Sequence, residues 1–157
     1  MFELNITWWE LAGRLLLAAV LGGVLGWDRE AHNKPAGVRT FMIVALGSTG
    51  LALIADGLFE VMRREPQLYG GLDPSRILQG IIGGIGFIGA GTIIRGEAKV
   101  QGITTAAGIW LAAAVGIAVG LGSYSLAIAL SALGVIVLAA VGFFTVRVLD
   151  QKDGPDD

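Results

Sequence analysis

Charged residues crowd one short segment of the chain and could form ion pairs there. The segment runs from position 28 to position 39, and its members are Asp28, Arg29, Glu30, Lys34 and Arg39. Arg39 opens an apolar run, and a charge in apolar surroundings usually has a partner of opposite sign. We therefore expect Arg39 to pair with Asp28 or Glu30. In the alternative interpretation, these side chains only anchor helix ends at a membrane surface.

Asp73, Arg76 and Gln79 form a second polar group, at the start of another apolar run. Asp73 precedes Pro74, an order typical of a helix N-cap followed by proline in the first turn. In the alternative interpretation the Asp73 carboxylate binds a divalent cation, because magnesium prefers oxygen ligands and keeps several of its waters. Asp73 is thus the candidate metal ligand of the sequence.

The other polar residues near the apolar runs do not combine into a catalytic site. Thr104 and Thr105 begin a run that also holds Trp110, and their hydroxyls could cap a helix or line a polar path. Glu10 and Arg14 are four residues apart and are expected to pair along one helix face. The chain has one histidine and no cysteine. Because no nucleophile, base and orienting group recur together, we expect no enzymatic activity.

A glycine-rich segment, Gln79–Thr92, is the most unusual stretch of the chain. Its glycines are Gly80, Gly83, Gly84, Gly86, Gly89 and Gly91. The spacing G-x-G-x-x-G within it matches a dinucleotide-binding fingerprint, but that fingerprint needs a preceding strand and an acid about 20 residues further on. Neither is present, since residues 103–121 hold no acid, so we reject nucleotide binding. On a helix, Ile81, Ile85 and Ile88 share one face, which we expect to meet lipid. The bare glycine face is predicted to pack closely on other helices, or alternatively to bend and present backbone groups to an ion.

The composition indicates that the elements that position these groups are transmembrane helices. The chain is 54% hydrophobic and 15% charged, with a mean hydropathy of +0.72. Its net charge of −2 offers no basic footprint for nucleic acid. An apolar run of about 20 residues spans a bilayer, and five runs predict an all-α polytopic membrane protein with five transmembrane helices: Trp8–Trp27, Val38–Ala55, Ile77–Ile94, Ile103–Leu121 and Tyr124–Val146.

The distribution of lysine and arginine predicts the orientation. Seven of them lie on the side that carries the connection between the first two runs, against three on the other side. The positive-inside rule then places the N-terminus outside and the C-terminus in the cytoplasm. Residues 1–150 form one transmembrane domain in this interpretation, and the acidic segment 151–157 is expected to be a disordered tail.

Several separated motifs together resemble the MgtC/SapB family, over a region from about residue 14 to residue 124. The matching stretches are Asp28-Arg29-Glu30, Lys34-Pro35-Ala36-Gly37-Val38-Arg39-Thr40, Asp73-Pro74-Ser75-Arg76, Gly84-Ile85-Gly86-Phe87-Ile88-Gly89-Ala90-Gly91 and Gly102-Ile103-Thr104-Thr105-Ala106-Ala107 with Trp110. Asp28 stands where the family commonly has glutamate, and Phe41 where histidine is common. Longer family members carry a cytoplasmic domain after the fifth span, whereas this sequence ends at Asp157, so we expect a short form.

The resemblance implies a bacterial inner-membrane protein linked to magnesium limitation, stress adaptation and virulence. It implies regulation of other membrane proteins, with the F-type ATP synthase as the proposed partner, and no cofactor apart from possible magnesium. The alternative is an oligomeric cation transporter or channel-like protein, whose path would run past Asp73, Gln79 and the glycine helix towards Arg39 and Glu30. We expect a homo-oligomer in membrane lipid, and the transporter hypothesis requires one, because five spans leave little room for a pore within one chain.

Overall fold

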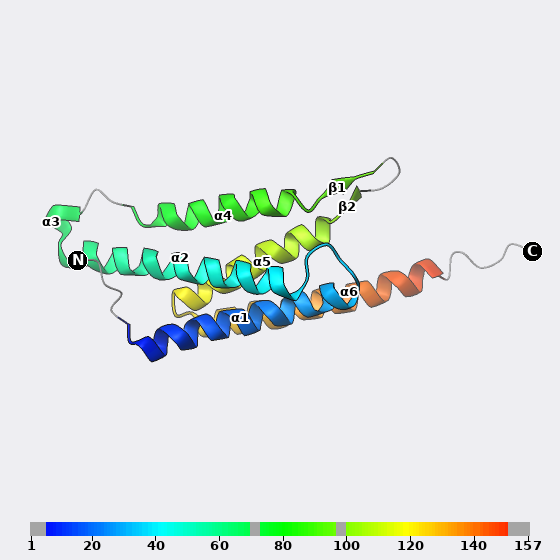
Figure 1. Cartoon of the computed structure of the whole chain (residues 1–157), viewed down its shortest axis with the longest axis horizontal. Helices are drawn as coiled ribbons and strands as arrows, with labels where there is room; N and C mark the ends of the chain where they lie inside the picture. Colours follow the sequence, from blue (N-terminus) through cyan, green and yellow to red (C-terminus); the bar gives the residue numbers. More distant parts are fainter. Residues whose placement is uncertain (1–5, 70–72, 97–99, 151–157) are drawn as a thin grey trace, which may run out of the picture.

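The computed structural model of the chain describes residues 6–69, 73–96 and 100–150, the side chains of 68–69 and 140–150 excepted. Within these residues the chain forms a helical bundle and one short antiparallel hairpin (Figure 1). The helices are α1 (Trp8–Ala31), α2 (Val38–Arg64), α3 (Pro66–Tyr69), α4 (Ser75–Ala90), α5 (Ile103–Gly120) and α6 (Tyr124–Asp150). The hairpin joins β1 (Ile94–Arg95) to β2 (Val100–Gln101).

The predicted all-α class is confirmed, and each of the five apolar runs lies largely within one of the five long helices. The third run differs most from its prediction, because α4 stops at Ala90 instead of Ile94. Gly91 is the C-cap residue of α4; beyond it the Thr92 hydroxyl donates to the Gly89 carbonyl oxygen at 2.7 Å, and the chain then enters β1. The proposed acidic tail, 151–157, lies outside the described residues.

Successive long helices run in alternate directions (Figure 1). We call the end where α1 and α4 begin the N-terminal end of the bundle, and the other the opposite end. Helix α2 packs against α1 and α5 in the centre, and α6 covers α5 and α1. Helix α4 contacts α5 and, less extensively, α2, so one side of it has no neighbour within the described chain.

Helices α2 and α5 approach so closely that they need small residues in contact. A Cβ atom on Gly116 would overlap the Ala45 carbonyl oxygen and lie 2.9 Å from the Ser48 Cβ. At the same level the buried Thr49 hydroxyl lies 2.8 Å from the Gly116 carbonyl oxygen and 2.9 Å from that of Ala45, to which it can donate. Close backbone contact and a side-chain hydrogen bond between helices are the usual means of holding helices together in lipid.

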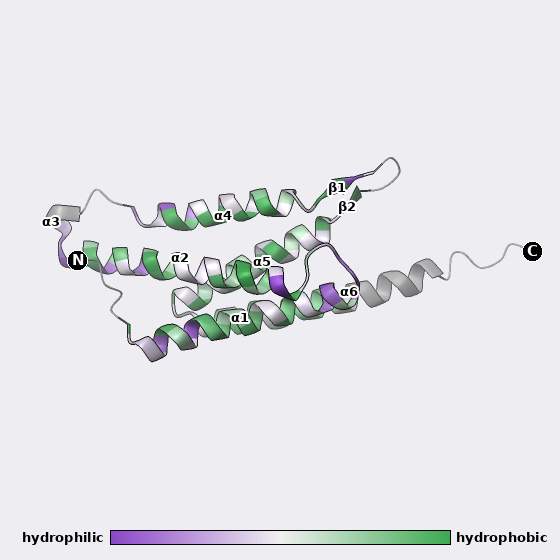
Figure 2. Cartoon of the chain, in the orientation of Figure 1, coloured by the Kyte–Doolittle hydropathy of each residue, from purple (hydrophilic) through white to green (hydrophobic). Residues whose placement is uncertain are grey.

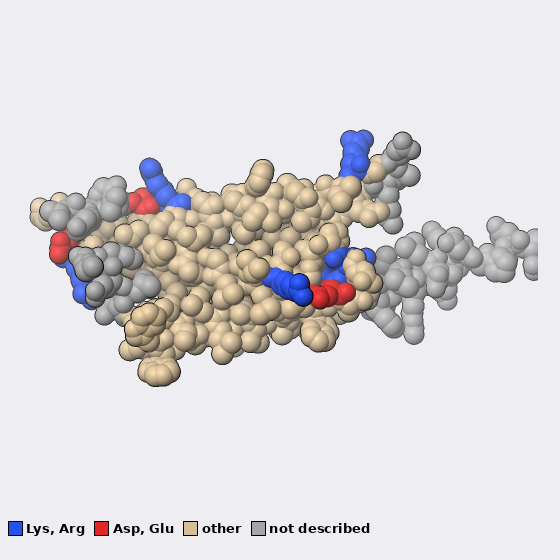
Figure 3. All heavy atoms as spheres, viewed as in Figure 1, with Lys and Arg blue, Asp and Glu red and all other residues tan. Residues whose placement is uncertain are grey.

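Three helices, α1, α2 and α5, are each long and apolar enough to cross a membrane. Helix α4, with 16 residues, and Tyr124–Ala139, the part of α6 whose side chains are described, are apolar but shorter. Hydrophobic colour runs along the helices in Figure 2. On the face seen in Figure 3, charged side chains gather towards the two ends, with a band free of Lys, Arg, Asp and Glu between them. This arrangement is typical of a protein whose middle lies in hydrocarbon.

The outward orientation predicted for Ile81 and Ile85 on α4 is wrong within the chain, whereas Ile88 is exposed as predicted. Ile81 and Ile85 are 6% and 9% exposed and face the bundle, whereas a Cβ atom on Gly80, Gly83, Gly84 or Gly86 would meet no atom within 4 Å. Bulky side chains fill the space between α4 and its neighbours, so the bare side turns outward. Of the glycines that we assigned to close packing, Gly89 is the one whose added Cβ would contact another helix, 3.5 Å from the Ala106 Cβ.

Candidate functional site

An ion pair between a buried arginine and a partly buried aspartate lies at the opposite end of the bundle, near the end of α1. Arg29 is only 7% exposed, and its Nη2 and Nε lie 2.6 and 3.2 Å from Asp28 Oδ2. The other carboxylate oxygen, Oδ1, lies 3.2 Å from Nδ1 of the exposed His32. Asp28 thus holds a buried cation in place and offers a second oxygen towards the surface.

The predicted pairing of Arg39 with Asp28 or Glu30 is wrong. Arg39 is exposed, and within the described part of the chain no ion pair joins it to an acid. Glu30 instead accepts a hydrogen bond from the Val38 N–H at 2.8 Å. This bond caps α2, whose N-cap residue is a glycine and has no side chain to do so. Lys34 lies exposed in the same connection.

Asp73 caps the start of α4, as its place before proline predicts. One of its oxygens, Oδ1, accepts from the Ser75 N–H at 3.0 Å and from the Ser75 hydroxyl at 2.6 Å. These hydrogen bonds, first that of the hydroxyl, lower the pKa of Asp73, and the Arg76 charge lowers it further. Gln79 is exposed one turn later. Among the described residues no group of three or more acids or histidines is close enough to hold a metal ion.

A polar recess of about 900 Å³ lies at the N-terminal end, and the sequence did not reveal it. The start of α1, the second half of α2 and the start of α3 enclose it, and its charged residues are Glu10, Arg14, Asp56, Glu60 and Arg63. Residues about 50 positions apart meet here only because α1 and α2 run in opposite directions. Asp73 is not among the lining residues, so the recess is separate from the predicted outer motif.

Arg14 ties three helices together beside this recess. Its Nη2 pairs with Glu10, as the i, i+4 spacing predicts, and its Nη1 donates to the Gly120 carbonyl oxygen at 2.8 Å. The guanidinium carbon lies 5.8 Å from the centre of the Tyr124 ring, within the range of a cation–π contact. A charge within an apolar helix is thus partnered by protein, as membrane insertion would require.

The residues predicted at the start of α5 have separate environments. Thr105 is buried and Thr104 is exposed, and neither side chain caps α5, whose N-cap residue is Gly102 in a left-handed conformation with φ of 91°. Trp110 is half-exposed and lies two turns further on, beside α4. The structure therefore does not bring the charged segment, the Asp73 group and the threonines into one site.

In a comparison with known proteins, one family matches most of the chain. The model of the MgtC family matches residues 15–146. YhiD of Escherichia coli K12, provisionally named a magnesium transporter, is 37% identical over 144 residues, which cover 91% of this chain and 66% of YhiD. SapB of Bacillus subtilis is 38% identical, covering 91% of this chain and 59% of SapB. MgtC of Salmonella typhimurium is 36% identical, covering 80% of this chain and 48% of MgtC.

The chain therefore spans about two thirds or less of the length of these three relatives. The matched region covers the charged segment, the Asp73 group, the glycine helix and the threonines. No solved structure matches the chain.

Proposed function

This chain belongs to the MgtC family, and on that premise we propose that it is a five-span bacterial inner-membrane protein that regulates other membrane proteins when magnesium is scarce. It does so without catalysis or a bound cofactor, by packing against partner helices, with the ATP synthase as one candidate partner and other copies of the chain as neighbours. Its N-terminus lies outside the cell, and the end bearing the Asp28–Arg29 pair faces the cytoplasm.

The outward face of α4 is the observation that carries this proposal. Gly80 and Gly83 leave the helix backbone uncovered, and Phe87 projects from the same face with 83% of its surface exposed. In lipid, uncovered glycine backbones let a second helix approach closely, and van der Waals contact then holds the two together. The buried isoleucines of α4 pack on its own chain, whereas its glycine side is uncovered and faces the membrane. This side is therefore available for contact with a helix of another protein.

The first test replaces a glycine on this face by leucine. Gly83→Leu should fold like the wild type, because no atom lies within 4 Å of its Cβ position, but it should abolish rescue of growth in low magnesium. The assay uses a strain that lacks its own family member and compares variants at equal amounts in the membrane. Gly47→Leu is the matched control, since Gly47 in α2 is equally open. Full rescue by Gly83→Leu would refute a role for the α4 face.

The polar recess favours a second function, entry of a cation. Asp56 lines the recess and is exposed, and in the described part of the chain it forms no ion pair. Magnesium binds in proteins through one or two carboxylates while it keeps several waters, so such a recess could admit the hydrated ion.

Magnesium uptake by liposomes that contain the purified protein separates the two functions. A regulator should give no uptake above that of empty liposomes. A transporter should give uptake that Asp56→Asn lowers severalfold and that Gly83→Leu leaves unchanged in the absence of partners.

A further inference from the structure

One exposed ridge of α1 has a tryptophan at each end. Trp9 and Trp27 are 88% and 73% exposed. They lie 18 residues apart, which corresponds to five helical turns, so both project from the same side of the helix. Leu16 and Val20 lie between them within about 20° of the same line, and are 67% and 52% exposed. These exposures show that no other described part of the chain covers the ridge.

The buried side of α1 shows how this helix packs against protein. A Cβ atom on Gly22 would lie 2.7 Å from the Phe41 carbonyl oxygen, and one on Gly26 would lie 2.7 Å from the Val38 Cα. Small residues thus let the α2 backbone approach closely, as is usual between helices in lipid. The ridge has Gly13 near one end and otherwise large side chains, which would keep a second backbone away. It therefore suits acyl chains better than a helix.

Charged groups on α1 begin at the level of each tryptophan. Glu10 follows Trp9, and Asp28 follows Trp27. Between these levels the one other charge on α1 is Arg14, about 7.5 Å further along the helix than Trp9. Arg14 turns to Glu10 and to a carbonyl oxygen of α5, so the ridge itself carries no charge between its tryptophans. Tryptophans that bracket an uncharged surface in this way are typical of the two interfaces of a bilayer.

Helix α2 offers a positive charge at the level of Trp27. Because Gly26 contacts Val38, the next residue on α2, Arg39, lies at that level. Arg39 is exposed and shares a face with Ile43, one turn further on and 68% exposed. An arginine next to such apolar surface extends its charged end into water and the phosphate layer. Phospholipid headgroups at this level complement the charge, and acyl chains complement the isoleucine.

The lengths of the helices indicate how thick a bilayer the chain fits. Along the helix axis, Trp9 and Trp27 are separated by about 27 Å. Helix α5 has 18 residues and α4 has 16, which correspond to about 27 Å and about 24 Å. The hydrocarbon core of a typical bilayer is about 30 Å thick. A helix that is too long can tilt, whereas one that is too short thins the bilayer around it.

We propose that the ridge of α1 faces the acyl chains of the bilayer, with Trp9 and Trp27 in the two headgroup layers, and that the protein fits a hydrocarbon core of about 27 Å. This inference rests on the proposed position of the chain in a membrane, but it does not depend on regulation or transport. Because lipid covers this ridge, partner proteins reach the bundle from other sides, among them the glycine side of α4.

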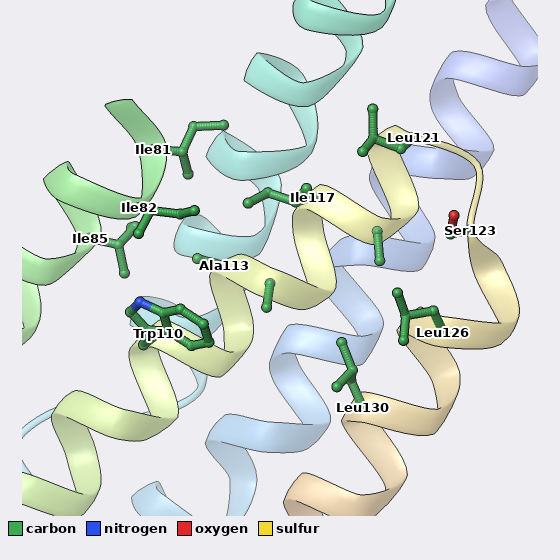
Figure 4. Close-up of a pocket in the computed structure, with 12 residues that line it drawn as sticks. Ile81, Ile82, Ile85, Trp110, Ala113, Ile117, Leu121, Ser123, Leu126 and Leu130 are labelled. Carbon is green, nitrogen blue, oxygen red and sulfur yellow. The ribbon is translucent and has the colours of Figure 1, made fainter. Parts of the chain in front are cut away.

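Quenching of tryptophan fluorescence by brominated phospholipids tests the ridge. Two variants retain either Trp9 or Trp27 and have phenylalanine at the other three tryptophans, one of which, Trp110, lies on α5 beside α4 (Figure 4). In liposomes, bromine near the headgroup should quench each retained tryptophan at least twofold more than bromine at the end of the acyl chains. Val20→Trp, in a chain without other tryptophans, is the matched control from the middle of the ridge and should show the reverse order.

Two outcomes of this experiment would overturn the proposal. If neither lipid quenches Val20→Trp, protein covers the ridge. If bromine at the chain ends quenches Trp9 and Trp27 most strongly, these side chains do not lie in the headgroup layers.

The acyl-chain length of the lipid tests the thickness with unchanged protein. Liposomes with a hydrocarbon core of about 27 Å are compared with liposomes of the same headgroup and a core of about 33 Å. On heating, the helical circular dichroism signal should be lost at a temperature several degrees lower in the thicker bilayer. Equal or greater stability there would refute the fit to a thin core. Neither readout involves growth rescue or magnesium uptake, so failure here is distinguishable from failure of the proposed function.

Discussion

Replacing Gly116 by alanine is expected to destabilise the folded chain by about 3 kcal/mol, the upper part of the usual range for an overpacked core. The added methyl group would overlap the Ala45 carbonyl oxygen, which is backbone and cannot rotate away. Helices α2 and α5 would have to separate, and the Thr49 hydroxyl would lose its contact with the Gly116 carbonyl oxygen. Unfolding in mixed micelles with increasing denaturing detergent, followed by circular dichroism, measures the loss.

Gly47→Ala is the control for this prediction. Gly47 lies on α2, close in sequence to Ala45, but its Cβ position has no atom within 4 Å. The same substitution there should change the free energy of unfolding by less than about 0.5 kcal/mol, as is usual for an open position. Equal stability of both variants and the wild type would show that α2 and α5 are further apart than the structure has them.

The helices were predictable from the sequence because hydrocarbon permits few backbone arrangements. A run of apolar residues long enough to cross a bilayer must satisfy its own backbone hydrogen bonds, and a helix does so. The five runs therefore become five long helices. Which face of each helix meets its neighbours depends on contacts between distant residues. The glycine count drew attention to α4, whereas the closest contact that a glycine makes between two helices joins α5 to α2 at Gly116.

The candidate sites show the same division between local and distant contacts. Asp73 caps α4 through a residue two positions away, and Arg14 pairs with Glu10 one turn away, so spacing alone predicted both contacts. The polar recess combines residues from the start of α1 and the second half of α2, which meet because the two helices are antiparallel, and no local pattern reveals this. The predicted pairing of Arg39 was wrong for a related reason: it is Arg29 that is buried and pairs with Asp28, and that burial depends on the surrounding helices.

Asp28→Asn is expected to cost about 3 kcal/mol of folding free energy, the loss typical of a broken buried ion pair. The variant leaves the Arg29 guanidinium buried beside a neutral amide, and the positive charge then lacks its counter-ion. Arg39→Gln is the matched control and should cost less than about 0.5 kcal/mol, because Arg39 is exposed and forms no ion pair with the described residues. The same detergent titration compares the two variants.

A double variant separates the loss of the charge pair from a general intolerance of change at this position. Asp28→Asn combined with Arg29→Met removes both charges and keeps an unbranched side chain at position 29. Because replacing both partners of a buried pair is often nearly neutral, the double variant should regain most of the stability that Asp28→Asn loses. Additive losses would mean that each residue acts through other contacts, and the pair would then have no role in holding the end of α1 in place.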